Sequence, residues 1–283
     1  MKPVIKWVGG KTQMLSQLRE LITPELLEGH TYYEPFIGGG ALAFDLEHKD
    51  TVIGDLNPEL VNMYKMIKAR PEDLIELLKT YWARHCEEEY YKIRALDRDP
   101  KYTIEEYPLS HAARTIYLNK FCFNGLYRVN SKGYFNSPIG RTTSGKPPVL
   151  PEEEIRALSK FLQTVEIYNL DYNAVACKAK EGDIVFLDPP YDPDEDISTG
   201  GFVGYQKGGW TRLDTNWLKE VVDKLTVRGV KVVLTNNNTT YIREIFKDYN
   251  IIEVDVRRSI NRDGNKRTGK EVIITNYEVT GDE

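Results

Sequence analysis

Short apolar runs rich in β-branched residues recur along this chain, and segments with helical periodicity fill most of the gaps between them. Seven runs predict strands, at residues 32–36, 51–56, 165–170, 183–187, 231–235, 251–256 and 271–277. Several are almost continuously apolar, which is typical of strands covered on both faces of a parallel sheet. The last two are separated by a polar, glycine-containing stretch and are predicted to pair antiparallel. The pattern predicts an α/β sandwich with a seven-stranded sheet.

Residues 58–150 interrupt this alternation. Helical periodicity continues there through four consecutive segments, and a polar, glycine-bearing stretch follows them. The predicted helices lie at 60–69, 71–83, 87–96 and 110–121. We therefore predict a mostly helical domain at 58–150, inserted into an α/β domain that consists of 1–57 and 151–283.

Composition excludes several classes of protein. The chain has 283 residues, of which 41% are hydrophobic and 29% charged, so it can bury a core without disulfides or metals. Its three cysteines are widely spaced and its four histidines form no ligand pair, which favours a reducing compartment and no metal site. No apolar run approaches the roughly 18 residues of a membrane span, and the N-terminus lacks a signal-peptide core. We expect a cytoplasmic protein with no membrane partner.

The charge distribution is uneven. The net charge of −5 argues mildly against a nucleic-acid partner. However, residues 128–146 hold four basic residues and no acid, and residues 257–270 hold six basic residues and one acid. Because salt screens charges beyond about 8 Å, a bound polyanion responds to a nearby patch more than to the total charge. Composition alone leaves the question of nucleic acid open.

Residues 34–43 combine the end of a predicted strand, a glycine turn and the start of a helix. Gly38 and Gly40 allow the backbone to approach a ligand closely. Asp55 ends the next predicted strand, where a carboxylate can bind both hydroxyls of a ribose. Sites for NAD, FAD and S-adenosylmethionine share this arrangement, so the pattern leaves the cofactor open. The stretch at 9–12 lacks the rest of a P-loop, which excludes a nucleoside triphosphatase.

The motif Asp188-Pro189-Pro190-Tyr191 directly follows the apolar run at 183–187. It therefore lies at the carboxyl end of a strand, where open α/β folds bind their ligands. The two prolines have no N–H, so the backbone offers carbonyl acceptors there, beside a carboxylate and an aromatic ring. Such a set suits a planar group that carries an NH₂. Alternatively, the prolines only end the strand and the tyrosine packs in the core.

Several segments, taken in order, resemble the Dam-type DNA adenine-N6 methyltransferases of the D12 class, with the α-group motif order. They are Lys6-Trp7-Val8-Gly9-Gly10-Lys11, the glycine loop at 34–40, the stretch at 123–138, Asp188-Pro189-Pro190-Tyr191 and the basic segment at 257–260. The resemblance implies a Rossmann-like methyltransferase sheet, with the inserted domain carrying a DNA-recognition hairpin. It also implies S-adenosylmethionine as cofactor and methyl transfer to N6 of an adenine flipped out of double-stranded DNA. The family's usual target is GATC.

The resemblance implies roles for individual residues. The catalytic residues are Asp188, Pro189, Pro190 and Tyr191, of which Asp188 and the Pro189 carbonyl accept from the adenine amino group while Tyr191 stacks on the base. The cofactor-binding residues are Trp7, Lys11, Glu34, Phe36, Gly38, Gly40, Asp55, Asp171 and Asp188. The DNA-binding residues are Lys6, Phe123, Asn124, Arg128, Asn130, Asn136, Arg141, Arg257, Arg258 and Arg267.

Some of these assignments have alternatives. Asp171 is a candidate helix cap as well as a partner for the cofactor adenine. Phe202, Tyr205 and Trp210 either form a lid over the base or belong to a loop with scattered aromatic residues.

Three other functions stay open for the whole chain: a non-catalytic DNA-binding protein, a dinucleotide oxidoreductase, and a methyltransferase for cytosine N4, RNA or another DNA site. A monomer that methylates one strand at a time is the simplest expectation. The sequence does not decide whether the enzyme accompanies a restriction nuclease, acts alone or belongs to a phage.

Overall fold

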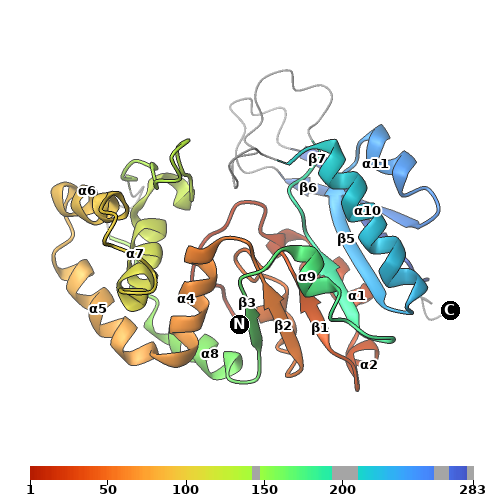
Figure 1. Cartoon of the computed structure of the whole chain (residues 1–283), viewed down its shortest axis with the longest axis horizontal. Helices are drawn as coiled ribbons and strands as arrows, with labels where there is room; N and C mark the ends of the chain where they lie inside the picture. Colours follow the sequence, from red (N-terminus) through yellow and green to blue (C-terminus); the bar gives the residue numbers. More distant parts are fainter. Residues whose placement is uncertain (142–146, 193–209, 258–267, 279–283) are drawn as a thin grey trace. The chain divides into compact units, whose positions relative to one another are not determined.

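The computed structural model describes residues 1–141, 147–192, 210–257 and 268–278 (Figure 1). The chain divides into two compact units. The first consists of Met1–Gly10, Gly38–Lys49 and Asp55–Asn169, and the second of Lys11–Ile37, Asp50–Gly54 and Leu170–Glu283. The first unit contains the whole segment 58–150 that was predicted as an insertion, together with flanking segments. The division into a catalytic domain (1–57 and 151–283) and a target-recognition domain (58–150) stays a prediction.

The second unit holds six strands of the seven-stranded sheet, in the order β2-β1-β4-β5-β7-β6. Their bounds are Tyr32–Glu34 (β1), Thr51–Gly54 (β2), Ile184–Leu187 (β4), Lys231–Asn237 (β5), Asn250–Arg257 (β6) and Thr268–Thr275 (β7). Strands β2, β1, β4 and β5 are parallel, whereas β7 is antiparallel to β5 and β6. The seventh strand, β3 (Glu166–Tyr168), belongs to the first unit. The predicted α/β class, its seven strands and the antiparallel final pair are confirmed.

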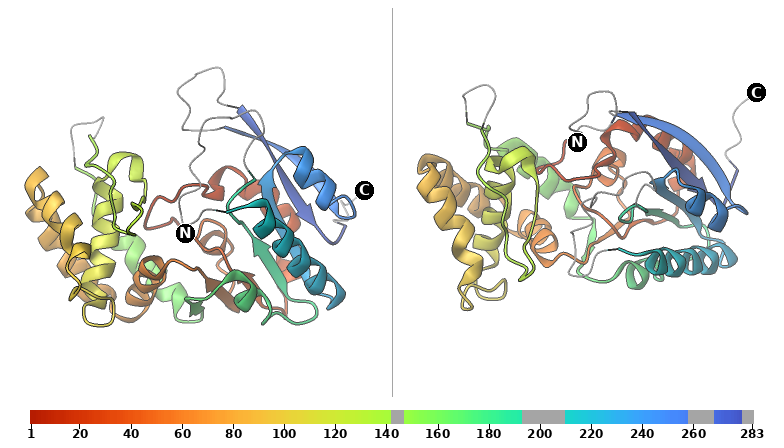
Figure 2. Two further views of the ribbon diagram at one scale, coloured as in Figure 1. Left: turned by 45° about the horizontal axis from the view of Figure 1, so that its top comes forward. Right: turned by 90° about the horizontal axis from the view of Figure 1, so that it is seen from above.

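Helices cover both faces of the sheet in the second unit. They are α1 (Leu15–Leu21), α2 (Pro24–Leu27), α9 (Tyr172–Ala176), α10 (Arg212–Val227) and α11 (Thr240–Ile245), preceded by a 3-10 turn at Lys11–Gln13. Helix α9 packs on β1 and β2 and α10 on β5, while α1 lies on the opposite face (Figure 2). All four residues of β4 are buried, which stabilises the strand by about 1.5–3 kcal/mol for each large apolar side chain. This burial makes the carboxyl end of β4 a rigid base for the residues that follow.

The first unit is mostly helical. Its helices are α3 (Ala43–Leu46), α4 (Pro58–Ala69), α5 (Pro71–Ala83), α6 (Glu87–Ala95), α7 (Pro108–Phe121) and α8 (Glu152–Leu162), with 3-10 turns at Leu96–Arg98 and Phe123–Gly125. Helix α7 lies at the centre and packs against α4, α5 and α6. It buries His111, Arg114 and Asn119 among its apolar residues. Because a buried polar group without a partner is costly, these side chains are expected to hold neighbouring segments.

The strand predicted at 51–56 ends two residues early, at Gly54. The reason is local: Oδ1 of Asp55 accepts the N–H of Asn57 at 2.9 Å, which turns the chain away from the sheet. Asn57 in turn caps α4 by accepting the N–H groups of Glu59 and Leu60. Asp55 therefore stands between a strand end and a helix start.

Candidate functional site

Asp188 follows β4 directly and is held by two donors from other elements of the second unit. Its Oδ1 lies 2.8 Å from Nζ of Lys11 and accepts the Thr235 hydroxyl at 2.7 Å. Asp188 is 17% exposed, whereas Lys11 and Thr235 are buried. Both contacts use Oδ1, and no residue in the described ranges donates to Oδ2. The carboxylate is thus fixed in orientation and has lone pairs left on one oxygen for a donor.

Tyr191 is fixed at its ring and at its hydroxyl. Nζ of Lys11 lies 4.7 Å from the ring centroid, and the hydroxyl donates to Oε2 of Glu271 on β7 at 2.8 Å. Burial raises the pKa of Tyr191 well above its usual value, and the neighbouring carboxylates of Asp188 and Glu271 raise it further. The phenol therefore stays neutral and remains a donor. Lys11, predicted from sequence as a cofactor ligand, is placed here between the two motif residues.

The chain is also anchored where it leaves the motif. Asp192, 1% exposed, donates its N–H to Oδ1 of Asn236 at 3.0 Å and accepts the Thr239 hydroxyl at 2.9 Å. Arg212 at the start of α10 completes the set, with Nε 3.3 Å from Oδ1 of Asp192. Sequence analysis missed this cluster, because no local pattern marks Asp192 as buried.

An aromatic cluster surrounds Phe36. Its ring stacks on Tyr172 at 5.1 Å between centroids, and Trp210 meets it edge-on at 6.0 Å. Trp210 is fixed by an N–H···O bond of 2.9 Å to Thr215. Asp171 is the N-cap of α9, where its Oδ1 accepts the N–H of Asn173 at 2.9 Å. The helix-cap role for Asp171 is thus present in the structure, and its cofactor role stays a prediction.

Two of the aromatic residues predicted for a lid, Phe202 and Tyr205, lie outside the described residues. Glu34, predicted as a cofactor ligand, is buried at the end of β1 and accepts the Tyr32 hydroxyl at 2.7 Å.

In the first unit, Asp55 meets the glycine loop. Its Oδ2 accepts the N–H of Gly38 at 3.2 Å. Burial raises the pKa of Asp55 to about 6, and the backbone N–H groups oppose this increase only in part. A carboxylate offers about four lone-pair positions, so one remains for a hydroxyl donor beside the bonds from the N–H groups of Gly38, Leu56 and Asn57.

The glycine loop has no room for side chains. Gly38 (φ +47°) would place a Cβ 2.8 Å from Cδ1 of Trp7, and Gly40 (φ +71°) would place one 2.2 Å from Cε2 of Phe44. The Tyr64 hydroxyl, from α4, holds the loop by donating to the Gly38 carbonyl at 2.7 Å. Trp7, Gly38 and Asp55, which were predicted together as cofactor-binding, do lie together.

Residues 122–140 form a hairpin, which we call the recognition hairpin, with antiparallel bridges Val129↔Phe135 and Cys122↔Ile139. Nε of Arg128 donates to Oδ1 of Asn136 at 2.7 Å, so two of the predicted DNA-binding side chains bind each other. Oδ1 of Asn130 accepts two backbone N–H groups of the hairpin turn.

Four of the predicted DNA-binding residues outside these pairs are exposed. At the base of the hairpin, Phe123 is 54% exposed and Asn124 has φ +56°. Lys6 and Arg141 are exposed as well. Arg257 ends β6, whereas Arg258 and Arg267 lie outside the described residues.

Asn119 ties Lys6 to the recognition hairpin. Its Oδ1 accepts the Lys6 N–H at 2.9 Å, while its Nδ2 donates to the Lys6 carbonyl at 2.7 Å and to the Gly125 carbonyl at 3.1 Å. One buried amide therefore sets the position of two segments that are far apart in sequence. Sequence analysis missed Asn119, because a polar residue within a helical pattern gives no sign of what it contacts.

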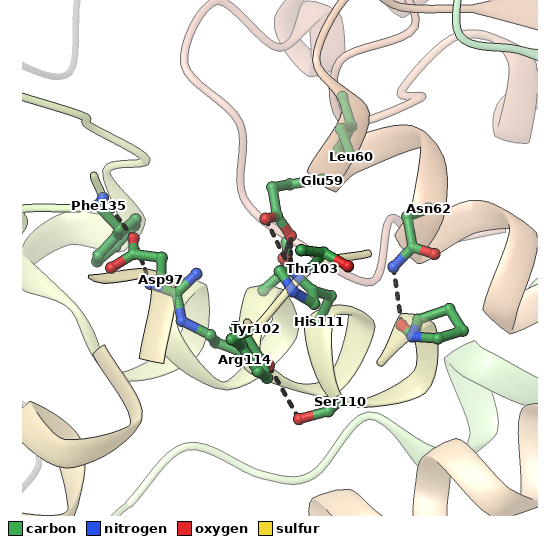
Figure 3. A network of polar contacts seen from close by, with 12 residues as sticks. Glu59, Leu60, Asn62, Asp97, Tyr102, Thr103, Ser110, His111, Arg114 and Phe135 are labelled. Carbon is green, nitrogen blue, oxygen red and sulfur yellow. Dashed lines mark hydrogen bonds and ion pairs between the residues drawn. The ribbon is translucent and has the colours of Figure 1, made fainter. Parts of the chain in front are cut away.

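A buried polar network supports the recognition hairpin from α7 (Figure 3). Oδ2 of Asp97 accepts the N–H of Phe135 at 2.8 Å and lies 2.6 Å from Nη2 of Arg114. Further along α7, Nδ1 of His111 lies 2.8 Å from Oε1 of Glu59, in the first turn of α4. The network connects the start of α4 with α7, and α7 with the hairpin backbone.

Two general features follow from the described residues. Among them, no group of three or more His, Cys, Asp or Glu side chains is arranged to hold a metal ion. None of the helices within the described ranges is both long and apolar enough to cross a membrane.

Comparison with known proteins gives a consistent result. The family model of the D12 class N6 adenine-specific DNA methyltransferases matches residues 7–260. The chain is 37% identical over 281 residues to the Type II methyltransferase M1.LlaDCHI of Lactococcus lactis subsp. cremoris, covering 98% of this chain and 96% of that protein. It is 37% identical over 293 residues to the Type II methyltransferase M.MjaIII of Methanocaldococcus jannaschii, covering 98% and 99%. It is 28% identical over 275 residues to the DNA adenine methylase of Escherichia coli K12, covering 96% and 94%.

Proposed function

Because this chain belongs to the D12 class N6 adenine-specific DNA methyltransferases, we propose that it transfers a methyl group from S-adenosylmethionine to N6 of an adenine flipped out of double-stranded DNA. The observation that carries this proposal is the arrangement at the end of β4. There, the Asp188 carboxylate, whose Oδ2 receives no bond from a donor in the described ranges, follows the strand directly and precedes the Tyr191 ring, which is held at its hydroxyl.

The chemistry of the adenine amino group explains why these residues are needed. Its nitrogen is a poor nucleophile, because its lone pair is delocalised into the ring. Hydrogen bonds from its two protons to Oδ2 of Asp188 and to the Pro189 carbonyl favour a tetrahedral nitrogen, on which the lone pair is localised. The carboxylate also stabilises the positive charge that develops on the nitrogen until the nitrogen loses one of its protons to solvent. Lys11 and Thr235 serve this step by holding Asp188 in one orientation.

Tyr191 contributes to the binding of the flipped base. Flipping the base out of the duplex costs a few kcal/mol of free energy. Stacking of the flipped base on an aromatic ring offsets about 1–3 kcal/mol of this cost. Since Lys11 covers one face of the Tyr191 ring, the base stacks on the other face. The ring thereby holds the base in the plane in which its amino group reaches Asp188.

The residues of each unit fit S-adenosylmethionine. Asp55 keeps a lone-pair position for a ribose hydroxyl beside its bonds from backbone N–H groups, and the glycine loop at Gly38 and Gly40 packs closely against the Trp7 and Phe44 side chains. Phe36, with Tyr172 stacked on it, offers an aromatic surface of the kind that binds an adenine ring. When bound, the cofactor supplies an electrophilic methyl group on a sulfonium, and Asp188 attracts that positive charge.

For DNA, we propose that the recognition hairpin contacts base edges in GATC. Arginine pairs bidentately with guanine and asparagine with adenine, each giving about 1–3 kcal/mol of discrimination. Arg128 and Asn136 exchange their mutual bond for these contacts, and Phe123 is exposed enough to enter the base stack. The basic segment with Arg258 and Arg267 is assigned to phosphates, which position the protein without specifying sequence.

This division of roles is testable with two variants. Arg128→Ala is expected to relax sequence preference, whereas Arg267→Ala lowers affinity for every sequence and flattens its salt dependence. The measurement is the binding constant for cognate and scrambled duplexes over a range of salt concentrations. Equal loss on both duplexes for Arg128→Ala contradicts its assignment to a base edge.

The reaction itself is tested by incubating the full chain with S-adenosylmethionine and methylation-free genomic DNA, then mapping modified bases by single-molecule sequencing. N6-methyladenine confined to GATC supports the reaction and the target together. N6-methyladenine at another sequence supports the proposed reaction but refutes GATC as its target. No modified base, in a preparation that binds the cofactor, refutes the reaction and favours an RNA substrate or a non-catalytic role.

A further inference from the structure

Two separate hydrogen bonds link the motif residues Asp188 and Tyr191 to the neighbouring strands β5 and β7. Thr235 on β5, fully buried, donates to Asp188, and Glu271 on β7 accepts from Tyr191. In the antiparallel β5–β7 pair, Glu271 lies opposite Asn237, two residues after Thr235. Residues two apart on a strand share a face, so Thr235 and Glu271 are diagonal neighbours on one face of the sheet. The sheet thus determines the spacing between the two partners.

We propose that Glu271 is a positioning residue for methyl transfer, which it serves by fixing the orientation of the Tyr191 ring relative to Asp188; the inference rests on the proposed function. A phenol O–H lies in the plane of its ring, because the oxygen is conjugated with it. An acceptor that is fixed on a strand therefore favours the orientation of the Tyr191 ring in which the plane of the ring contains that acceptor. With Oε2 of Glu271 at 2.8 Å, this constraint acts through a bond of ordinary length.

Lys11 supplies the second constraint. Its Nζ lies over the ring at 4.7 Å and simultaneously 2.8 Å from Asp188. The ring is thus held against Lys11 on one face and by Glu271 at its edge, while Asp188 is held by Lys11 and Thr235. A base stacked on the remaining face meets an acceptor at a defined distance. Loss of the Glu271 bond releases the ring without removing any group that touches the base.

The test is a double-mutant cycle with Glu271→Ala, Tyr191→Phe and the double variant, measured as the single-turnover rate of methylation of a GATC duplex at saturating S-adenosylmethionine. Each single variant is expected to slow the rate about tenfold, the equivalent of one lost hydrogen bond. The double variant is expected to be no slower than Tyr191→Phe alone, because loss of the Tyr191 hydroxyl already removes its bond to Glu271. Glu271→Gln, which keeps an acceptor oxygen, is expected to restore the rate to within about threefold.

Three controls make the result specific. Glu253→Ala removes an exposed acid on the adjacent strand β6 that pairs with Arg243 and Lys270, and leaves the rate unchanged. The dissociation constants for cofactor and DNA are expected to stay the same in Glu271→Ala, which separates loss of positioning from loss of the fold. Should Glu271→Ala fail to fold, Glu271→Met, which fills the volume without a strong acceptor, replaces it in the cycle.

Multiplicative effects in the double variant, or a rate for Glu271→Ala within twofold of the wild type, overturn the proposal. A wild-type protein that makes no N6-methyladenine on any DNA refutes the proposed function instead. An active wild type with multiplicative effects refutes only the role of Glu271.

Discussion

Because we propose that Asp55 binds the cofactor ribose, we expect its raised pKa to make cofactor affinity depend on pH. Ribose hydroxyls donate to an ionised carboxylate, so binding favours the deprotonated form of Asp55. Burial raises the pKa of this group to about 6 from the usual 3.8. At pH 5 the free protein is therefore mostly protonated at Asp55, and binding must first remove the proton.

The expected magnitude follows from that pKa. One unit below the pKa corresponds to a factor of ten, or about 1.4 kcal/mol, so affinity falls about tenfold between pH 7.5 and pH 5. An aspartate with the usual pKa of 3.8 would lose almost nothing over the same interval. The assay is isothermal titration calorimetry of S-adenosylmethionine binding, at constant ionic strength, in steps of half a pH unit.

Asp55→Asn is the control, since it removes the titrating group and keeps the shape. Its affinity is expected to be weaker at pH 7.5 and independent of pH down to 5. The stability of the fold depends on pH in the opposite direction from cofactor affinity. The folded state binds the Asp55 proton more tightly than the unfolded state does, so protonation stabilises the fold. The free energy of unfolding therefore falls as pH rises from about 4 to 6 in the wild type, and this component of the slope is absent in Asp55→Asn. A wild-type affinity that stays constant down to pH 5 refutes the reasoning.

Three further predictions concern catalysis and stability. Asp188→Ala is expected to lower single-turnover methylation at least about a hundredfold with DNA affinity retained, and near-normal turnover contradicts the mechanism. Gly40→Ala is expected to lower the free energy of unfolding by about 2–4 kcal/mol, because the new Cβ would lie 2.2 Å from Phe44 at a φ of +71°. Gly133→Ala, with a φ of +86° but open space around the Cβ, is expected to lower it by only about 1 kcal/mol. Equal losses in denaturant titrations would show that the clash with Phe44 does not decide the effect. Asp97→Ala is expected to cost about 3 kcal/mol in the same titrations, because it leaves a buried guanidinium without its carboxylate; a loss below 1 kcal/mol contradicts this.

Much of the fold was predictable because its signals lie within short windows of sequence. The run at 184–187 is entirely buried and is strand β4, and the helical patterns at 60–69 and 71–83 differ from α4 and α5 by two residues at most. Where an end was misplaced, a side chain acted on its own backbone, as Asp55 does after β2.

The candidate site was predictable in part. The sequence predicted Asp188 and Asp55 because each lies at the end of a predicted strand, and Tyr191 because it belongs to the same motif as Asp188. The residues that hydrogen-bond to these side chains could not be predicted from any local sequence pattern, because they lie far away in the sequence. Thr235 lies 47 residues from Asp188, Glu271 lies 80 residues from Tyr191, and Asn119 lies 113 residues from Lys6.

The sequence by itself determined the α/β class, the order of the motifs and which chemical groups we propose for methyl transfer. Only the tertiary structure decided what holds those groups: Lys11 between Asp188 and Tyr191, Glu271 on the Tyr191 hydroxyl, and Asn119 on the backbone of Lys6. The physical reason is that hydrophobic periodicity is a property of neighbouring residues, whereas a hydrogen-bond partner depends on strand order and register. Those are set by the packing of the whole core.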